Sequence, residues 1–308
     1  MTVKIKKAIM AAAAILALWC CGSGETTVEA DHVQSSDDDT LSLRVAVMPT
    51  MDCLPLFVAS ESGIFERESL SVVLVPFTAH MDCDTAIAGG TVHAMPTDLV
   101  RSERLAGQGT QLRLVAATDL QWQLLAAKTA RIRKLPQMDD KMMAMTRYSA
   151  TAMMADHLVD SAKLEQERVF RIQVNDVLVR LNMMENGIMD AMLLPEPQAT
   201  AARNAGCNML YDSGTDSMAM GVIAFSEKAL DDTLRRQQMQ AFIRAYDEAC
   251  DSINTLGLNH YRQVIAERCH VDEAAADSMI RQHPPKYFHA REPRQRDVER
   301  ARKWISKK

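Results

Sequence analysis

The 308-residue sequence lacks the short motifs that define several common classes of protein. It has no Cys-x-x-Cys pair and no Cys/His spacing typical of a structural zinc site. It has no G-x-x-x-x-G-K-[ST] loop, so the chain cannot itself be a P-loop ATPase. Positive charge is also scarce, because 40 acidic residues outnumber 35 basic ones and the net charge is −5. This balance argues against a nucleic acid as partner.

The N-terminus has the pattern of an export signal. Three lysines precede an apolar run over residues 8–18, which is too short for a permanent transmembrane helix. Cys21 follows this run like the lipidated cysteine of a bacterial lipoprotein, and Cys20 is the alternative. Cleavage before Cys21 would remove three lysines and no acids, taking the net charge from −5 to about −8. We therefore expect a signal peptide over residues 1–21 and a flexible, acidic tether over residues 22–40.

Strand-like and helix-like segments alternate from residue 43 onward. This alternation predicts βαβ units and two mainly parallel sheets. Beyond residue 226 only helical patterns follow, near residues 229–256, 260–269, 272–282 and 295–306. We expect an α/β fold with two lobes that close by hinge bending. The first lobe would comprise residues 41–128 plus 216–308 and the second residues 129–215, with chain crossings near 125–135 and 213–222.

The tripeptide Met-Asp-Cys occurs twice, at residues 51–53 and 81–83, each time between a predicted strand and a predicted helix. Asp52 and Asp82 are well placed to cap these helices, and a contact to a cationic ligand is the alternative. Cys53 and Cys83 could form a disulfide or remain two buried thiols, and the sequence leaves both open. A metal site that adds His80 matches no familiar geometry, and we predict none.

The residues that follow the predicted strands are the candidate ligand-binding residues, because ligands bind beyond the carboxyl ends of strands in open parallel sheets. The helices that follow these strands direct free N–H groups into the same space, which favours an anion or a polar acceptor. In the first lobe the candidates are Thr50, Met51, Asp52, Thr78, His80, Met81, Asp82 and Asp98. In the second lobe they are Arg147, Tyr148, Ser149, Asn175 and Glu196.

Arg147 is the preferred candidate for binding an anionic group, since a guanidinium suits carboxylate and sulfonate oxygens. It could instead pair with Glu196 or Asp98 across the cleft. Ser149 would more simply cap a helix. Four acids outnumber Arg147 among the candidates, so we expect a neutral or amine-bearing heterocycle rather than nitrate or sulfate; these acids are Asp52, Asp82, Asp98 and Glu196.

Three stretches carry a resemblance to a known family. One is "PLFVASESGIFERESLSVVLVPF" (55–77), and the second is "ENGIMDAMLLPEPQATAARNAGCNML" (185–210). The third is the tail, with "FIRAYDEACDSIN" (242–254) and "ARKWI" (301–305). Their order and spacing resemble the bacterial solute-binding proteins of the SsuA/THI5-like (NMT1-like) family, which serve sulfonate, nitrate and thiamine-pyrimidine uptake.

The resemblance implies a two-lobed periplasmic-binding-protein fold of the type II kind with a helical C-terminal tail. It implies a small molecule bound between the lobes and delivered to an ABC permease and its ATPase. We expect a lipid-anchored, exported monomer with no cofactor and no catalytic residues. Two alternatives remain: a ligand sensor on the same fold, or an enzyme with Cys53 or Cys83 as nucleophile and His80 as base. No clear third group orients such a base.

Overall fold

The computed structural model describes residues 41–216 and 218–308. The signal peptide and tether predicted over residues 1–40, with Cys21, lie outside these ranges. The strands are β1 (Leu43–Val47), β2 (Val72–Pro76), β3 (Ala94–Asp98), β4 (Leu112–Ala117), β5 (Trp122–Ala126), β6 (Lys141–Met145), β7 (Val169–Gln173), β8 (Ala191–Pro195), β9 (Asn208–Asp212) and β10 (Gly221–Ser226). Each falls within a segment that the sequence predicts to be a strand.

The α-helices alternate with these strands and then form the tail. They are α2 (Leu54–Glu61), α3 (Ile64–Arg67), α4 (His80–Ala88), α5 (Leu99–Gly107), α6 (Ala150–Ser161), α7 (Val177–Glu185), α8 (Gln198–Asn204), α9 (Thr233–Leu256), α10 (Arg262–Cys269), α11 (Glu273–Gln282) and α12 (Gln295–Ile305). Short 3-10 turns are η1 (Met51–Cys53), η2 (Lys128–Ala130), η3 (Leu135–Met138), η4 (Gln166–Arg168), η5 (Ala229–Asp231) and η6 (Leu258–Tyr261). No helix of the described ranges is both long enough and apolar enough to cross a membrane.

The strands form two five-stranded sheets with the same plan. The first has the order β2-β1-β3-β10-β4 and the second the order β7-β6-β8-β5-β9. In the first sheet β1 is parallel to β2 and β3, whereas β10 runs antiparallel to β3 and β4. In the second sheet β5 is the reversed strand, antiparallel to β8 and β9. Each sheet is therefore mixed, with four strands in one direction and one reversed, which agrees with the predicted α/β fold class.

The sheet membership of β5 differs from the sequence-based expectation. Residues 122–128 were assigned to the first lobe, but β5 pairs with β8 and β9 along its whole length. The chain therefore crosses to the second sheet between β4 and β5, over residues 118–121, and not near 125–135. The chain returns to the first sheet between β9 and β10. A single strand pattern does not reveal its partners, which explains the error.

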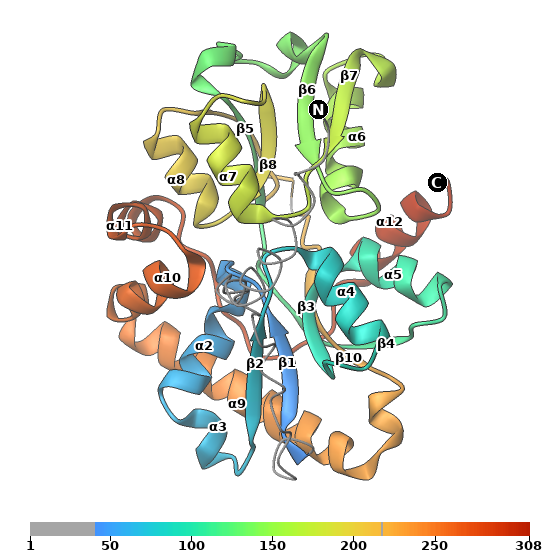
Figure 1. The fold of residues 1–308 in the computed structure, drawn as a ribbon, viewed down its shortest axis with the longest axis vertical. Coiled ribbons are helices and arrows are strands. Elements are labelled where there is room, and N and C mark those ends of the chain that lie inside the picture. Colours follow the sequence, from blue (N-terminus) through green and yellow to red (C-terminus); the bar gives the residue numbers. More distant parts are fainter. Residues whose placement is uncertain (1–40, 217) are drawn as a thin grey trace, which may run out of the picture. The chain divides into compact units, whose positions relative to one another are not determined.

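Helices cover both faces of each sheet (Figure 1). On the first sheet, α2 and α9 pack together on one face, while α4 and α5 cover the other (Figure 1). On the second sheet, α7 and α8 pack together on the face opposite α6 (Figure 1). The tail does not belong to the first lobe alone, because α11 packs against α8 and α12 packs against both α5 and α6. This arrangement leaves the carboxyl ends of both sets of parallel strands facing the junction of the two sheets.

Candidate ligand-binding crevice

The turns that follow five strands, together with Trp122 at the start of β5, line one narrow crevice between the two sheets. The crevice has a volume of about 30 Å³. Its first-sheet residues come from the ends of β1, β2 and β3, and its second-sheet residues from the ends of β6 and β7. The lining residues are Met48, Thr50, His80, Asp98, Arg101, Trp122, Thr146, Ser149, Thr151, Asn175, Val177 and Arg180. Five sequence-based candidates therefore meet here: Thr50, His80, Asp98, Ser149 and Asn175.

Asp98 joins the two sheets at the centre of the crevice. Its Oδ1 caps α5 by accepting hydrogen bonds from the backbone N–H of Val100 at 2.9 Å and of Arg101 at 3.0 Å. The same oxygen accepts a hydrogen bond at 3.0 Å from the backbone N–H of Ala150, at the start of α6. Burial raises the pKa of Asp98 to about 6, although Arg101 and these N–H groups oppose the shift. Asp98 thus holds the first turns of two helices from different sheets against one another.

Arg101 brings a buried positive charge to the crevice. Its side chain is 1% exposed and forms an ion pair with the buried Asp84 of α4. Arg104 approaches the same carboxylate at 3.5 Å. The Nη1 atom of Arg101 is buried and has no hydrogen-bond partner. A buried N–H without an acceptor is costly, so an acceptor supplied by a ligand would be stabilising there.

Arg180 is a second buried guanidinium in the crevice wall. It donates hydrogen bonds to the carbonyl oxygens of Val174 at 2.6 Å and Leu193 at 2.9 Å, and to the hydroxyl of Thr146. None of these acceptors is a carboxylate, so they do not neutralise its charge. Burial and the nearby Arg101 together lower the pKa of Arg180 to about 10. It remains protonated near neutral pH.

The remaining groups also suit a negatively charged ligand. Burial, Arg101 and Arg180 lower the pKa of His80, so its imidazole is neutral near pH 7. The first turns of α4, α5, α6 and α7 all contribute to the crevice or border it. The positive ends of helix dipoles favour anions. The first N–H groups of α5, α6 and α7 already donate to Asp98, Ser149 and Asp176. Ser149 caps α6 as predicted, accepting a hydrogen bond from Thr151 N–H at 3.2 Å.

Asp52 and Glu196 do not line the crevice. Asp52 lies within η1, and its Oδ1 accepts a hydrogen bond at 2.6 Å from the Thr50 hydroxyl. Glu196 forms an ion pair with Arg203 at 3.0 Å and accepts hydrogen bonds from Gln123 and from the backbone of Thr200. These bonds connect Glu196 to β5 and α8, and Glu196 also lines a separate pocket of about 230 Å³. The backbone N–H of Met51 donates to the Glu196 carbonyl at 3.2 Å, which links the two sheets.

Asp82 and Thr78 lie at a separate groove beside β2. This groove, of about 630 Å³, is lined by Val47, Met48, Pro49, Phe57, Leu74, Pro76, Phe77, Thr78, Asp82, Glu267, Arg268 and His270. The Thr78 hydroxyl donates to the Asp176 carboxylate of the second sheet. Met81 accepts a hydrogen bond at 3.3 Å from Gln173 through its sulfur. Asp82 is exposed within the first turn of α4.

The predicted caps at Asp52 and Asp82 are wrong. The N-cap positions are Thr50 for η1 and Ala79 for α4, two and three residues earlier. The helical turns begin directly at the strand ends, so each aspartate lies inside the first turn, where an acid is favourable through the helix dipole.

Arg147, the preferred anion-binding candidate, is exposed and is not among the residues that line the crevice. Its neighbour Tyr148 is also exposed, with a left-handed backbone (φ 52°). The Tyr148 ring stacks under the guanidinium of Arg104 at 5.7 Å, which is a contact between the two sheets. The buried cations of the crevice are instead Arg101 and Arg180.

The five cysteines of the described ranges are free and buried. Cys53 Sγ accepts a hydrogen bond at 3.3 Å from the Met48 backbone, and the Cys83 thiol contacts the Met48 sulfur at 3.8 Å. Of the two alternatives for this pair, the structure has separate thiols. Burial raises the pKa of both thiols. Neither has the exposed, acidic character of a catalytic nucleophile, which weakens the enzyme alternative.

The signal for Arg101 and Arg180 was present in the sequence but was not used. Arg180 lies in "VLVRLNMME", where Val177, Arg180, Leu181 and Met184 recur at helical spacing and are buried together. An arginine on the apolar face of a helix needs a polar partner inside the protein. Arg101 likewise needs a polar partner inside the protein, because it lies between the buried residues Val100 and Ser102.

Sequence comparison places the chain in a family. Residues 50–254 match the NMT1/THI5 like family, and they make up two thirds of the 308 residues. The chain therefore belongs to this family, as the sequence motifs predicted. No curated protein matches the chain by sequence.

The fold is shared with solved solute-binding proteins. The ligand-binding component of an ABC-type import system from Staphylococcus aureus is 12% identical with a TM-score of 0.72, covering 86% of this chain and 91% of that chain. The alkanesulfonate-binding protein SsuA from Xanthomonas axonopodis pv. citri, bound to MOPS, is 14% identical with a TM-score of 0.71 and the same coverage. The periplasmic nitrate-binding protein NrtA from Synechocystis PCC 6803 is 12% identical with a TM-score of 0.66, covering 76% and 68%. The chain thus has the periplasmic-binding-protein fold.

Proposed function

We propose that this protein is an exported, lipid-anchored solute-binding protein that captures a small molecule between its two sheets and delivers it to an ABC permease. Family membership and the shared fold with binding components of import systems support this function. The N-terminal pattern supports export and lipidation at Cys21. The meeting of five strand ends at one crevice supports its location.

The ligand that fits best carries an anionic group. The observation that carries this conclusion is the buried Nη1 of Arg101, which lacks an acceptor. Arg180 adds a guanidinium whose hydrogen-bond acceptors are all neutral. Charge-assisted hydrogen bonds from guanidinium to carboxylate, sulfonate or phosphate oxygens are strong and directional. Of the acids that had suggested an amine-bearing ligand, only Asp98 lines the crevice, so a sulfonate-like ligand is favoured over a neutral thiamine-pyrimidine-like heterocycle.

Binding a whole ligand requires that the two sheets move apart. The crevice of about 30 Å³ holds one or two water molecules. Small-molecule sites usually enclose roughly 300–1,000 Å³. The contacts to be broken include the hydrogen bonds of Asp98 with Ala150 and of Met51 with Glu196. Hinge bending at the two crossings supplies such a motion.

Trp122 provides a direct test, because its indole lines the crevice. The intrinsic fluorescence of the protein is titrated with nitrate, phosphate, ethanesulfonate, taurine, small carboxylates and an uncharged aminopyrimidine. We expect saturable quenching or enhancement by at least one organic anion, and none by the uncharged aminopyrimidine. Binding of the aminopyrimidine alone would contradict the anionic ligand class, and binding of none would contradict the proposed function for this panel of substrates.

Two arginine variants locate the anion. Arg101→Lys keeps the charge beside Asp84 but removes the Nη1 donor, so the affinity for the anion should fall by roughly 10- to 30-fold, as for the loss of one charge-assisted hydrogen bond. Arg147→Lys is the matched control on the exposed turn, and its affinity should equal that of the wild type. Equal loss in both variants would place the anion elsewhere.

A further inference from the structure

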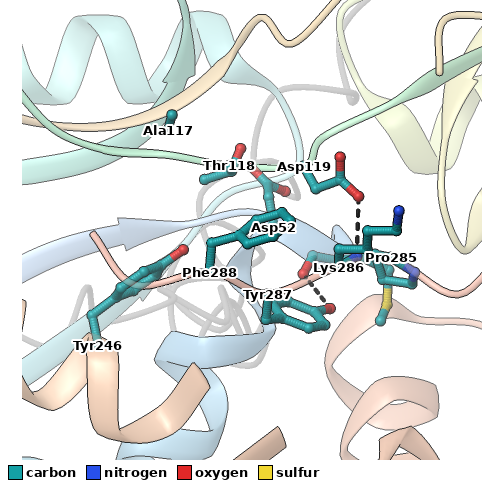
Figure 2. Close-up of a pocket in the computed structure, with 10 residues that line it drawn as sticks. Asp52, Ala117, Thr118, Asp119, Tyr246, Pro285, Lys286, Tyr287 and Phe288 are labelled. Atoms are coloured by element: carbon teal, nitrogen blue, oxygen red, sulfur yellow. Dashed lines mark hydrogen bonds between the residues drawn. The ribbon is translucent and has the colours of Figure 1, made fainter. Parts of the chain in front are cut away.

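A further, smaller pocket lies where the crossing from β4 to β5 meets the connection between α11 and α12. Its volume is about 10 Å³, enough for one occupant of the size of a water molecule. Figure 2 shows the walls of this pocket. They comprise Met51, Asp52, Ala117, Thr118, Asp119, Tyr246, Pro285, Lys286, Tyr287 and Phe288.

Asp52 is the unexplained group of this pocket. Its side chain is 5% exposed, and Oδ1 accepts the hydrogen bond from Thr50 at 2.6 Å. The second oxygen, Oδ2, is buried and has no hydrogen-bond partner. In Figure 2 the carboxyl group points toward the segment that carries Thr118 and Asp119. A buried carboxylate oxygen without a partner is costly, and a partner in the pocket would remove that cost.

Among the described residues, no Lys or Arg side chain is a cause that lowers the pKa of Asp52, although Lys286 belongs to the pocket wall. Burial raises the pKa of its carboxyl group to about 6, and the groups that oppose this shift are the Thr50 hydroxyl and a backbone N–H. The titratable groups that face Asp52 are thiols and phenols with raised pKa values, namely Cys53, Cys269, Tyr246 and Tyr287. Asp119 adds a second carboxylate to the wall, and it accepts a hydrogen bond at 3.0 Å from the backbone of Lys286. The Lys286 side chain is exposed.

We propose that this pocket binds one monovalent cation, with the Oδ2 atom of Asp52 as its charged ligand. Tyr246, Thr118 and Asp119 supply the other oxygen atoms around the pocket. The size of the pocket selects against divalent ions, because Mg²⁺ retains several water molecules and Ca²⁺ takes six to eight oxygen ligands. A transition-metal site is not indicated either, since the described ranges contain no group of three or more His, Cys, Asp or Glu side chains that could hold such an ion.

Thermal unfolding of the full chain tests the proposal. At pH 7.5 the midpoint is measured in 200 mM NaCl, KCl or choline chloride, which have equal ionic strength. We expect a midpoint roughly 2–4 °C higher in NaCl or KCl than in choline chloride. Equal midpoints in all three salts would overturn the proposal.

Two variants test whether the Asp52 side chain binds the cation. Asp52→Asn should abolish the difference between the salts, whereas Asp139→Asn should retain it, because Asp139 is partly exposed and paired with Arg168 on the second sheet. If Asp52→Asn does not fold, Asp119→Asn should raise the half-saturating cation concentration at least threefold. If the midpoint difference between NaCl and choline chloride persists unchanged in Asp52→Asn, the cation binds elsewhere. If only Asp119→Asn folds, an unchanged difference in that variant leads to the same conclusion.

Discussion

The pair of Arg101 and Asp84 gives the sharpest test of how the crevice is held together. Both side chains are buried, with exposed fractions of 1% for Arg101 and 8% for Asp84. Arg101→Met removes the cation but keeps much of the side-chain volume. Asp84 is then left as a buried carboxylate, for which breaking a pair typically costs about 3–5 kcal/mol. Arg104 remains 3.5 Å from Asp84, so we expect the lower end, about 3 kcal/mol.

The reverse change, Asp84→Leu, leaves the Arg101 charge buried beside an apolar group. We expect a loss of about 3–5 kcal/mol here as well. The double variant Arg101→Met/Asp84→Leu leaves neither charge unpaired, and replacing a whole buried pair by apolar residues is often nearly neutral. It should therefore be more stable than either single variant, with a coupling energy of at least about 2 kcal/mol.

Urea unfolding followed by circular dichroism measures all four free energies of unfolding in this cycle. The reasoning fails if the two single losses simply add in the double variant. It also fails if either single change costs less than about 1 kcal/mol, because that is the range of an exposed pair. Either outcome would mean that the two side chains are solvated in solution.

Three further predictions follow from the buried groups. The folded-state pKa of Asp52 and Asp98, about 6, exceeds the unfolded value of 3.8, so the folded protein binds protons more tightly. Burial lowers the pKa of His80 and His93, which favours unfolding as the pH falls, so the test compares the wild type with a variant. Urea unfolding in choline chloride should show the free energy of unfolding of the wild type, relative to that of Asp52→Asn, rising by about 1 kcal/mol from pH 7 to pH 5; no relative rise would refute this. Gly221→Ala should destabilise the fold by about 1–3 kcal/mol in the same assay, because a Cβ there would lie 2.3 Å from Thr118 Oγ1, while Gly107→Ala, with open space around it, should be neutral. A thiol reagent should label none of the buried cysteines before unfolding, and early labelling would contradict the burial of Cys53, Cys83, Cys207, Cys250 and Cys269.

Local patterns in the sequence predict the elements of this fold well. Strand and helix segments follow from residue periodicity, which needs only neighbours along the chain. The cap at Ser149 is found for the same reason, because a serine before an alanine-rich helix accepts a bond from its own first turn. The cap at Asp176 likewise accepts from Leu178 and Val179.

Tertiary choices could not be predicted in this way. Whether β5 joins the first or the second sheet depends on strand pairing across the junction, which leaves no mark in the five residues of β5. Arg147 is exposed and outside the crevice lining, because position after a strand does not determine which way a side chain points. Arg147 points to solvent, whereas Arg180 is buried a full turn inside α7.

The buried charges of the protein fall into two groups with different consequences. Glu196 is satisfied by Arg203, Gln123 and the α8 backbone, and Asp98 Oδ1 by three N–H groups. These acids have little left to offer a ligand, and their bonds fix the positions of helices. In the second group, Arg101 Nη1 and Asp52 Oδ2 have no hydrogen-bond partner. Arg180 donates only to carbonyl and hydroxyl oxygens, and to no carboxylate. Buried charged atoms without a hydrogen-bond partner occur elsewhere too, at Arg171, Arg203 and Asp297, so an unmatched atom alone does not define a site. Arg101 and Asp52 differ because each lines a pocket, which is why we propose an anion beside the arginines and a cation at Asp52.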